Sequence, residues 1–302
     1  MIRFLGVLVG LGFAFVVLLA FGFGAYAFVT SPPEQSAEAR YHLAPRHDVR
    51  YSFEGPLGRF DYQQLQRGFQ VYREVCSTCH GLSQVAFRNL RDIGYSEAEV
   101  RAIADQWPHQ MASINPDTGE AATRKPIPAD HIPGPYANDT QARAANNNAL
   151  PPDLSLMAKA REGGPHYIHS LLTGFRNPPA GFEVPQNLHY NPYFANLNIA
   201  MPPPLTADGQ VTYGPGNPRP TVDQMAQDVS AFLMWSAEPS METRHQVGIP
   251  VLVFLLIATI LAYLSYQNIW HGGDRRVRAT GPLDPDNMDK RQQASREAGV
   301  TE

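Results

Sequence analysis

Cys76-Ser77-Thr78-Cys79-His80 contains the only two cysteines among the 302 residues of the chain. Their spacing is C-x-x-C, and a histidine follows immediately. Two thiols at this spacing can add to the two vinyl groups of a haem while the adjacent imidazole binds the iron, which is the pattern of c-type haem attachment. The motif therefore predicts one covalently bound haem c, attached through Cys76 and Cys79, with His80 as an iron ligand.

Two other uses of a C-x-x-C pair fit this chain less well. A thioredoxin-like redox pair would need a βαβ context and has no requirement for a histidine. A structural zinc site would need a second pair of ligands, and no further cysteine exists to supply it. We therefore keep covalent haem as the interpretation.

Two long apolar stretches flank the middle of the chain. Residues 4–28 and 247–270 carry no formal charge, and each is long enough to cross about 30 Å of hydrocarbon as a helix. Basic residues lie outside both stretches, namely Arg3, Arg275, Arg276 and Arg278. The positive-inside rule then predicts that both ends lie in the cytoplasm and that the middle part is exported. An exported domain is where haem is attached in bacteria, so we expect a bacterial inner-membrane protein with its middle part in the periplasm.

These boundaries predict four parts of the chain. They are an N-terminal transmembrane helix or uncleaved signal anchor (1–30), a periplasmic haem domain (31–246), a C-terminal transmembrane anchor (247–271) and a disordered cytoplasmic tail (272–302). Ala25-Tyr26-Ala27 also fits a signal-peptide cleavage site, but signal cores usually span only about 7–15 residues. We expect Pro250 to lie in the first turn of the second span, where its missing N–H removes no bond.

Composition predicts a mainly α, loop-rich domain, and the haem motif makes it a domain of the cytochrome c type. The chain has 27 prolines and 24 glycines, which favours short helices joined by long ordered loops. Asp61 is expected to cap a helix leading into the haem motif, with Gln64 completing a capping box. Apolar periodicity predicts further helices over 96–107, 153–161, 166–172 and 221–235, and a short strand over 210–213.

Acidic residues outnumber basic ones, 28 to 24, so nucleic acid is not an expected partner.

The function of a haem depends on whether a side chain fills the sixth position of its iron. A filled position favours electron transfer, whereas an open one binds small ligands or carries out redox chemistry on substrates. Met201 is the best candidate, because Pro202-Pro203-Pro204 stiffens the backbone behind its thioether. The other candidates are more often core or surface residues; they are Met157, Met225, Met234, His109, His131, His166, His169 and His189. His/Met ligation raises the potential of a haem, which suits an acceptor late in a quinol-fed chain.

From residue 51 onward the chain resembles the cytochrome c1 family, the haem c subunit of the cytochrome bc1 complex. C-x-x-C-H alone would indicate only a cytochrome c, whereas the motifs around it are more specific. They are Phe53-Glu-Gly-Pro-Leu-Gly58, Leu65-Gln-Arg-Gly-Phe-Gln-Val-Tyr72, Arg143-Ala-Ala-Asn-Asn147, Leu150-Pro-Pro-Asp-Leu-Ser155, Ala158-Lys-Ala-Arg161, Ser170-Leu-Leu-Thr-Gly174, Asn191-Pro-Tyr-Phe194 and Ile199-Ala-Met201.

The resemblance implies roles for particular residues. Cys76 and Cys79 would form the thioethers, with His80 as proximal and Met201 as distal ligand. Arg161 and Tyr167 would lie near a haem propionate, which a guanidinium and a phenol can neutralise and hydrogen-bond; from sequence alone Arg161 also fits a helix C-terminus at the surface. The chain departs from the family at Ala195-Asn196, where Pro-Gly is common, and at Asn148, where glycine is frequent.

The resemblance also implies the function of a redox subunit that itself catalyses no bond change. It would accept electrons from the Rieske iron–sulfur protein and pass them to a cytochrome c, beside cytochrome b in a dimeric complex. One alternative is the anchored monohaem subunit of a terminal oxidase or nitric oxide reductase, which usually carries its anchor at the N-terminus. The other is a haem sensor or peroxidase with an open sixth position, which would bind carbon monoxide readily.

Overall fold

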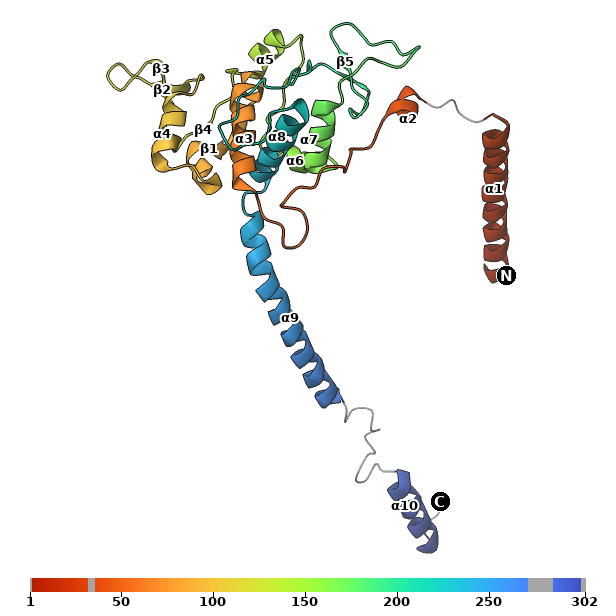
Figure 1. Ribbon diagram of the computed structural model, residues 1–302. Coiled ribbons are helices and arrows are strands. Elements are labelled where there is room, and N and C mark those ends of the chain that lie inside the picture. The colour runs from red at the N-terminus through yellow and green to blue at the C-terminus, as the bar shows by residue number, and fades with distance from the viewer. Residues whose placement is uncertain (1, 32–35, 271–284, 300–302) are drawn as a thin grey trace. The chain divides into compact units, whose positions relative to one another are not determined.

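The computed structural model describes residues 2–31, 36–270 and 285–299, in two compact units, Met1–Met241 and Glu242–Glu302. Within the first unit, helices α3 (Tyr62–Glu74) and α8 (Val222–Ala237) pack side by side, and α7 (Gly164–Thr173) lies against α8 (Figure 1). Long loops connect these helices. The expected mainly α, loop-rich fold is confirmed.

Helix α3 begins where the sequence predicts it, after Asp61. The Asp61 carboxylate accepts hydrogen bonds from the backbone N–H groups of Gln63 and Gln64, at 3.0 and 3.2 Å. The predicted capping box is wrong, because the Gln64 side chain instead donates to Asp228 on α8, at 3.2 Å. A long-range partner thus replaces the local one.

The α3–α8 crossing forms the centre of the core. A Cβ added to Gly68 would lie 2.0 Å from the backbone oxygen of Asp228, so only glycine permits this approach. Beside the crossing, the ring of Phe232 meets those of Phe69 and Tyr72, at centroid distances of 5.5 and 5.9 Å. These rings bury apolar area that stabilises the fold by about 1.5–3 kcal/mol for each fully buried side chain.

A buried ion pair lies next to this crossing. The Arg67 guanidinium donates to both carboxylate oxygens of Asp228, at 2.9 and 3.1 Å, and the Asp228 side chain is fully buried. Gln224 donates to the same carboxylate at 2.9 Å. With these bonds, the charge of Asp228 is compensated inside the core.

The other predicted helices have mixed outcomes. Helix α4 (Glu97–Asp105) begins after the Ser96 cap, and α7 and α8 also lie where they were expected. The helix predicted over 153–161 is wrong in length, since only α6 (Met157–Ala160) forms. The Asp153 carboxylate accepts from the N–H of Ser155 at 2.9 Å, which holds the preceding residues in a turn. Periodicity did not predict α2 (Ala37–Tyr41) or α5 (Asp139–Ala145).

Strands are few among the described residues and form three two-stranded sheets. Strand β1 (Leu82–Ala86) pairs with β4 (His131–Ile132), β2 (Met111–Ile114) with β3 (Ala121–Arg124), and β5 (His189–Tyr190) with β6 (Asn198–Ile199), all antiparallel. The strand predicted over 210–213 is wrong. Gln210 instead closes a turn, because its side chain accepts from Thr206 and donates to Pro204.

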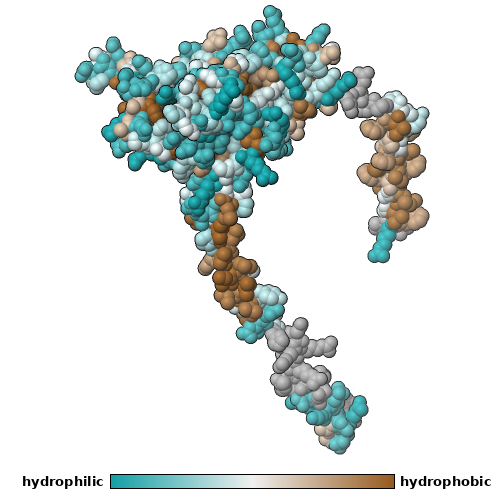
Figure 2. Space-filling view, in the orientation of Figure 1, coloured by the Kyte–Doolittle hydropathy of each residue, from teal (hydrophilic) through white to brown (hydrophobic). Residues whose placement is uncertain are grey.

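Two helices have the length and composition to cross a membrane, α1 (Ile2–Thr30) and α9 (Met241–Trp270). Figure 2 shows both as brown, apolar rods. Helix α9 begins earlier than the second apolar stretch, so the expectation that Pro250 lies in the first turn is wrong. Pro250 is inside the helix, where it removes one backbone hydrogen bond.

The predicted disorder of residues 272–302 is corrected in part. Helix α10 (Pro285–Glu297) forms in this tail, and its glutamine, arginine, alanine and glutamate residues are good helix formers. The rest of this prediction concerns mainly residues 272–284 and 300–302, which lie outside the described residues. The division of the chain into four functional parts stays a prediction.

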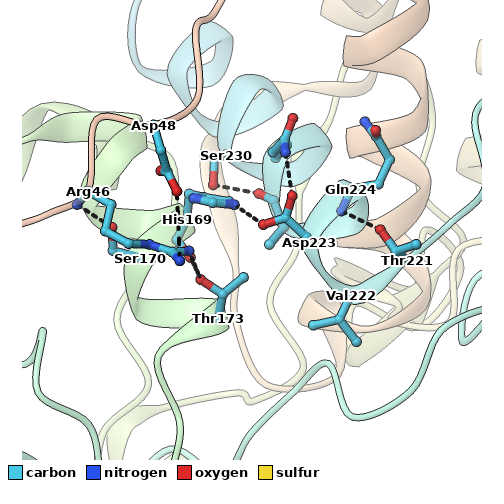
Figure 3. Close-up of polar contacts among 12 residues, drawn as sticks. Arg46, Asp48, His169, Ser170, Thr173, Thr221, Val222, Asp223, Gln224 and Ser230 are labelled. Atoms are coloured by element: carbon cyan, nitrogen blue, oxygen red, sulfur yellow. Dashed lines mark hydrogen bonds and ion pairs between the residues drawn. The ribbon is translucent and has the colours of Figure 1, made fainter.

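His169 on α7 is a fully buried titratable group that links two helices (Figure 3). Its Nε2 donates to Asp223 on α8 at 2.9 Å. Burial lowers the pKa of His169; Asp223 and Asp48 oppose this effect, and Arg46 adds to it. The imidazole is therefore neutral at pH 7, and its contribution to stability is lost as the pH falls below the unfolded value of 6.5.

We expect a His169→Phe variant to depend less on pH than the wild type. Phenylalanine keeps an aromatic ring in the core but carries no group that must be protonated in acid. Between pH 7.5 and 5, the melting temperature of the wild type should fall more than that of the variant, followed by circular dichroism. The same substitution at His42, which is exposed, is the control and should retain the wild-type profile. Equal slopes for His169→Phe and wild type would contradict the account.

Candidate haem-binding site

Helix α3 carries the C-x-x-C-H motif at its C-terminal end. Immediately after it, Cys76–Thr78 form a short 3₁₀ turn. The backbone oxygen of Cys76 accepts hydrogen bonds from the N–H groups of Cys79 and His80, at 3.1 and 2.9 Å. This single turn therefore brings together both thiols and the imidazole that the sequence predicts to hold haem.

Both cysteines are free thiols and partly buried. Burial raises the pKa of Cys76 to about 12, and the neighbouring Cys79 contributes in the same direction. A thioredoxin-like pair has the opposite character, because one thiol has a lowered pKa. No group of three or more His, Cys, Asp or Glu side chains that could hold a metal ion occurs among the described residues.

His80 is oriented by a backbone carbonyl. Its Nδ1 lies 2.8 Å from the oxygen of Pro152. A carbonyl oxygen can only accept, so Nδ1 carries the proton and Nε2 keeps a free lone pair. Burial lowers the pKa of His80, although the Pro152 bond and Asp153 oppose this effect. A neutral imidazole with its Nδ1–H bonded and its Nε2 free is the form that binds a metal.

The loop that holds His80 is fastened to β1. Leu154 donates its N–H to the oxygen of Gly81 at 3.0 Å, and the Asp153 carboxylate accepts from Ser83 at 2.8 Å. Burial pushes the pKa of Asp153 upward, but the bonds from Ser155 and Ser83 outweigh it and hold the pKa below its usual range. Asp153 is thus a stable anionic anchor for the Pro152 carbonyl.

Two glycines of this site were not recognised in the sequence. A Cβ on Gly81 would lie 3.2 Å from the Asp153 carboxylate and 3.3 Å from the Cα of Gly134. Gly81 follows His80 directly, and this place beside the haem motif is the sequence signal that could have identified it. Asn148, at the position where the family that the sequence resembles frequently has glycine, adopts a left-handed φ of +65°, which asparagine tolerates.

Met201 lies in a separate loop, with its side chain partly exposed. The turn before it is held to α7, because the Asn191 side chain donates to the oxygen of Leu171 at 2.8 Å and also accepts from the Tyr193 N–H. None of the hydrogen bonds among the described residues joins Met201 to the turn that carries His80. Its role as a ligand therefore stays a prediction.

Arg161 and Tyr167 are brought together by the structure. Arg161 follows α6 directly and is exposed, whereas Tyr167 lies in α7 and is partly buried. Burial raises the pKa of Tyr167, while the charge of Arg161 and a hydrogen bond to it act in the opposite direction. The pair offers a cation and a phenol side by side, which suits a carboxylate ligand.

The donor set fits a haem c. It offers two thiols on one turn, a neutral imidazole with a free Nε2, and a cation–phenol pair on the α6–α7 segment. His80, Cys76 and Cys79 come together as the sequence predicts. Met201, Arg161 and Tyr167 are in ordered segments, and their relation to a haem is not tested by the contacts.

Comparisons with known proteins give one family. The family model described as the Cytochrome C1 family matches residues 51–272. A cytochrome c1 from Rhodospirillum rubrum is 46% identical over 251 residues, which cover 78% of this chain and 91% of the relative. A cytochrome c1 from Blastochloris viridis is 42% identical over 277 residues, which cover 85% of this chain and 95% of the relative. A cytochrome b/c1 from Bradyrhizobium diazoefficiens is 44% identical over 243 residues, which cover 73% of this chain and 35% of that longer one.

Proposed function

Since this chain belongs to the cytochrome c1 family, we propose that it carries electrons from the Rieske iron–sulfur protein to a cytochrome c, as the haem c subunit of a cytochrome bc1 complex. Membership of the family makes it a haem protein of electron transport. The match over residues 51–272 is the observation that carries the proposal. It includes the haem motif, the Met201 loop and the second apolar helix.

One haem c would be held by four side chains. Cys76 and Cys79 would form its two thioethers, and His80 Nε2 and the Met201 sulfur would bind its iron. When bound, the haem supplies a reversible one-electron redox centre. The orientation of His80 by the Pro152 carbonyl, at 2.8 Å, supports its role, since a ring fixed in both redox states needs little reorganisation.

Arg161 and Tyr167 would act on a haem propionate. The contact between them holds the guanidinium beside the phenol, so one group can compensate the negative charge while the other donates a hydrogen bond. Met201 would close the sixth position with a soft thioether, which raises the potential and excludes small ligands. Together these residues would favour electron transfer over chemistry at the iron.

The chain is a membrane-anchored protein by its family and its two apolar helices. We propose that residues 31–246 lie in the periplasm and that the C-terminus lies in the cytoplasm, because Arg275, Arg276 and Arg278 follow the second span. The 28 acidic against 24 basic residues argue against a nucleic-acid partner.

The proposed partners are cytochrome b and the Rieske protein, in a dimeric complex. The Bradyrhizobium relative is named cytochrome b/c1, which joins b and c1 in one polypeptide. This fusion supports a fixed association between a cytochrome b and a protein of this family. The Rieske protein and the acceptor cytochrome c are proposed from the resemblance alone.

Purification of the full chain from its own membranes tests the proposed partners. A C-terminally tagged chain, extracted in mild detergent, should bring down cytochrome b and a Rieske protein, identified by mass spectrometry. The preparation should also reduce cytochrome c at the expense of a quinol. Membranes with an untagged chain are the control. Copurification with oxidase or nitric oxide reductase subunits in place of these partners would contradict the proposal.

A further inference from the structure

A segment at the N-terminal end of the predicted haem domain is bound to the loop that leads to Met201. We call residues 36–48 the N-terminal strap; it contains α2. The Tyr41 ring meets Phe182 edge to face at a centroid distance of 6.1 Å, and Phe182 meets Tyr190 at 5.2 Å. Tyr190 lies in β5, directly before the turn at Asn191.

The strap also reaches this turn through its backbone. The N–H of Leu43 donates to the oxygen of Pro192 at 2.8 Å. Pro192 is the second residue of Asn191-Pro-Tyr-Phe194, which precedes Met201. The bond therefore joins the strap to the start of the predicted ligand loop.

Arg46 fixes the other end of the strap on α7 (Figure 3). Its N–H donates to the Ser170 hydroxyl at 2.8 Å, and its guanidinium donates to the Thr173 hydroxyl at 2.7 Å. These bonds cross more than 120 residues of sequence, so they are tertiary contacts. The strap is thus attached to the C-terminal half of α7 as well as to the turn.

The turn rests on the same part of α7. Asn191 donates to the oxygen of Leu171 at 2.8 Å. The Tyr193 ring covers Gly174, where an added Cβ would lie 2.4 Å from a ring carbon. Strap, turn and α7 therefore form one hydrogen-bonded assembly.

This assembly includes a strained residue. Leu197 has a φ of +65° and is fully buried, a conformation that is unfavourable for a bulky L-residue. It is held because Leu197 donates to Phe194 at 2.9 Å and its carbonyl accepts from Asn191 at 2.8 Å. Such a conformation persists only where the surrounding structure determines it, and it lies four residues before Met201.

We propose that the N-terminal strap is a positioning element that holds the turn at residues 191–197, and through it the Met201 loop, in the conformation that binds iron. This inference rests on the proposed function, in which Met201 is the distal ligand. Contacts that exist only when the loop is closed shift its equilibrium away from an open form. Tyr41, Leu43 and Arg46 are then positioning residues for a ligand that they do not touch.

Leu43→Pro removes the strap's hydrogen bond to Pro192. Proline lacks the N–H, and the preceding His42 already has the extended backbone (ψ 132°) that proline requires of its neighbour. Leu43→Ala shortens the same side chain but keeps the N–H, and is the matched control. Both variants are made in the full chain and studied in the assembled complex.

The readout is the rate constant for carbon monoxide binding to the ferrous haem. This rate is proportional to the fraction of molecules with an open sixth position. Loss of one hydrogen bond should raise it about three- to tenfold in Leu43→Pro relative to Leu43→Ala. Met201→Leu is the reference for a fully open site and should give a larger increase.

The outcomes distinguish the claim that Met201 binds the iron from the claim that the strap positions the Met201 loop. If Met201→Leu accelerates binding but Leu43→Pro matches Leu43→Ala, the strap has no positioning role and Met201 is still the ligand. If Met201→Leu changes nothing, Met201 is not the ligand and the role of the strap fails with it. Where Leu43→Pro does not assemble, Arg46→Met removes the bond to Thr173 instead, with the exposed Arg50→Met as its control. A faster carbon monoxide binding rate in Arg46→Met than in Arg50→Met supports the positioning role of the strap. Equal rates in the two variants overturn that role.

Discussion

A Met201→Leu variant should lower the midpoint potential of the haem by on the order of 0.1 V, within the range of about 0.8 V over which axial ligands set haem potentials. The thioether favours the reduced iron, and leucine has no donor atom to replace it. Because 59 mV is a factor of ten for one electron, the equilibrium constant for reducing this haem should fall roughly fiftyfold. Redox titration of the purified complex measures the potential.

The same variant should lose the weak sulfur-to-iron charge-transfer band of the oxidised protein. Met157→Leu is the matched control, because Met157 packs against the apolar core and leucine replaces methionine there at little cost. Its potential and spectrum should match the wild type. An unchanged potential and an unchanged band in Met201→Leu would show that another group binds the iron.

A Gly68→Ala variant should be destabilised by about 3 kcal/mol or more. Alanine is a better helix former than glycine by roughly 0.5–1 kcal/mol. The variant should nevertheless be less stable than the wild type, because the steric clash outweighs this gain. The new Cβ would lie 2.0 Å from the Asp228 oxygen and 2.7 Å from the Phe232 Cβ. One of these atoms is backbone, so α3 and α8 must separate, and the Arg67–Asp228 pair would separate with them.

Thermal unfolding by circular dichroism checks this prediction. For a domain of this size, about 3 kcal/mol corresponds to a melting temperature roughly 6–12 °C lower. Gly214→Ala is the control for the substitution itself, because an added Cβ there meets only the Asn217 side chain, at 3.9 Å. If the two variants melt together, the close crossing of α3 and α8 is not needed for stability.

Local signals in the sequence predicted most of the helices. Asp61, Ser96 and Thr221 each cap the helix that they were expected to begin or precede, because a cap needs only residues two or three positions away. The 153–161 prediction failed because Asp153 is used in a turn and in the bond from Ser83. The two-residue strands β5 and β6 are too short to have a periodic pattern.

The candidate site was predictable where its chemistry is contiguous. C-x-x-C-H brings two thiols and an imidazole together in five residues, and the structure folds them as one turn. The Pro152 carbonyl that orients His80 is 72 residues away, and no residue type indicates which backbone oxygen will be used. The strap contact from Leu43 to Pro192 is hidden for the same reason.

The glycines show a further limit of the sequence. Gly68 in the middle of a helix and Gly81 after the haem motif were both passed over, although each lies at a close approach, which at Gly68 only glycine permits. A helix pattern identifies which side faces the core, but the distance between two helices depends on tertiary packing. Gly68 could be interpreted only once α8 was known to cross there.

The central claim is that haem is attached through both cysteines of one short peptide, and peptide mass spectrometry tests it directly. Trypsin cleaves after Arg73 and Arg88 and releases one peptide that contains Cys76, Cys79 and His80. In protein purified from its own membranes, the account predicts that this peptide carries the mass of one haem, with both sulfurs modified. An unmodified peptide, with two free thiols or a disulfide, would contradict it.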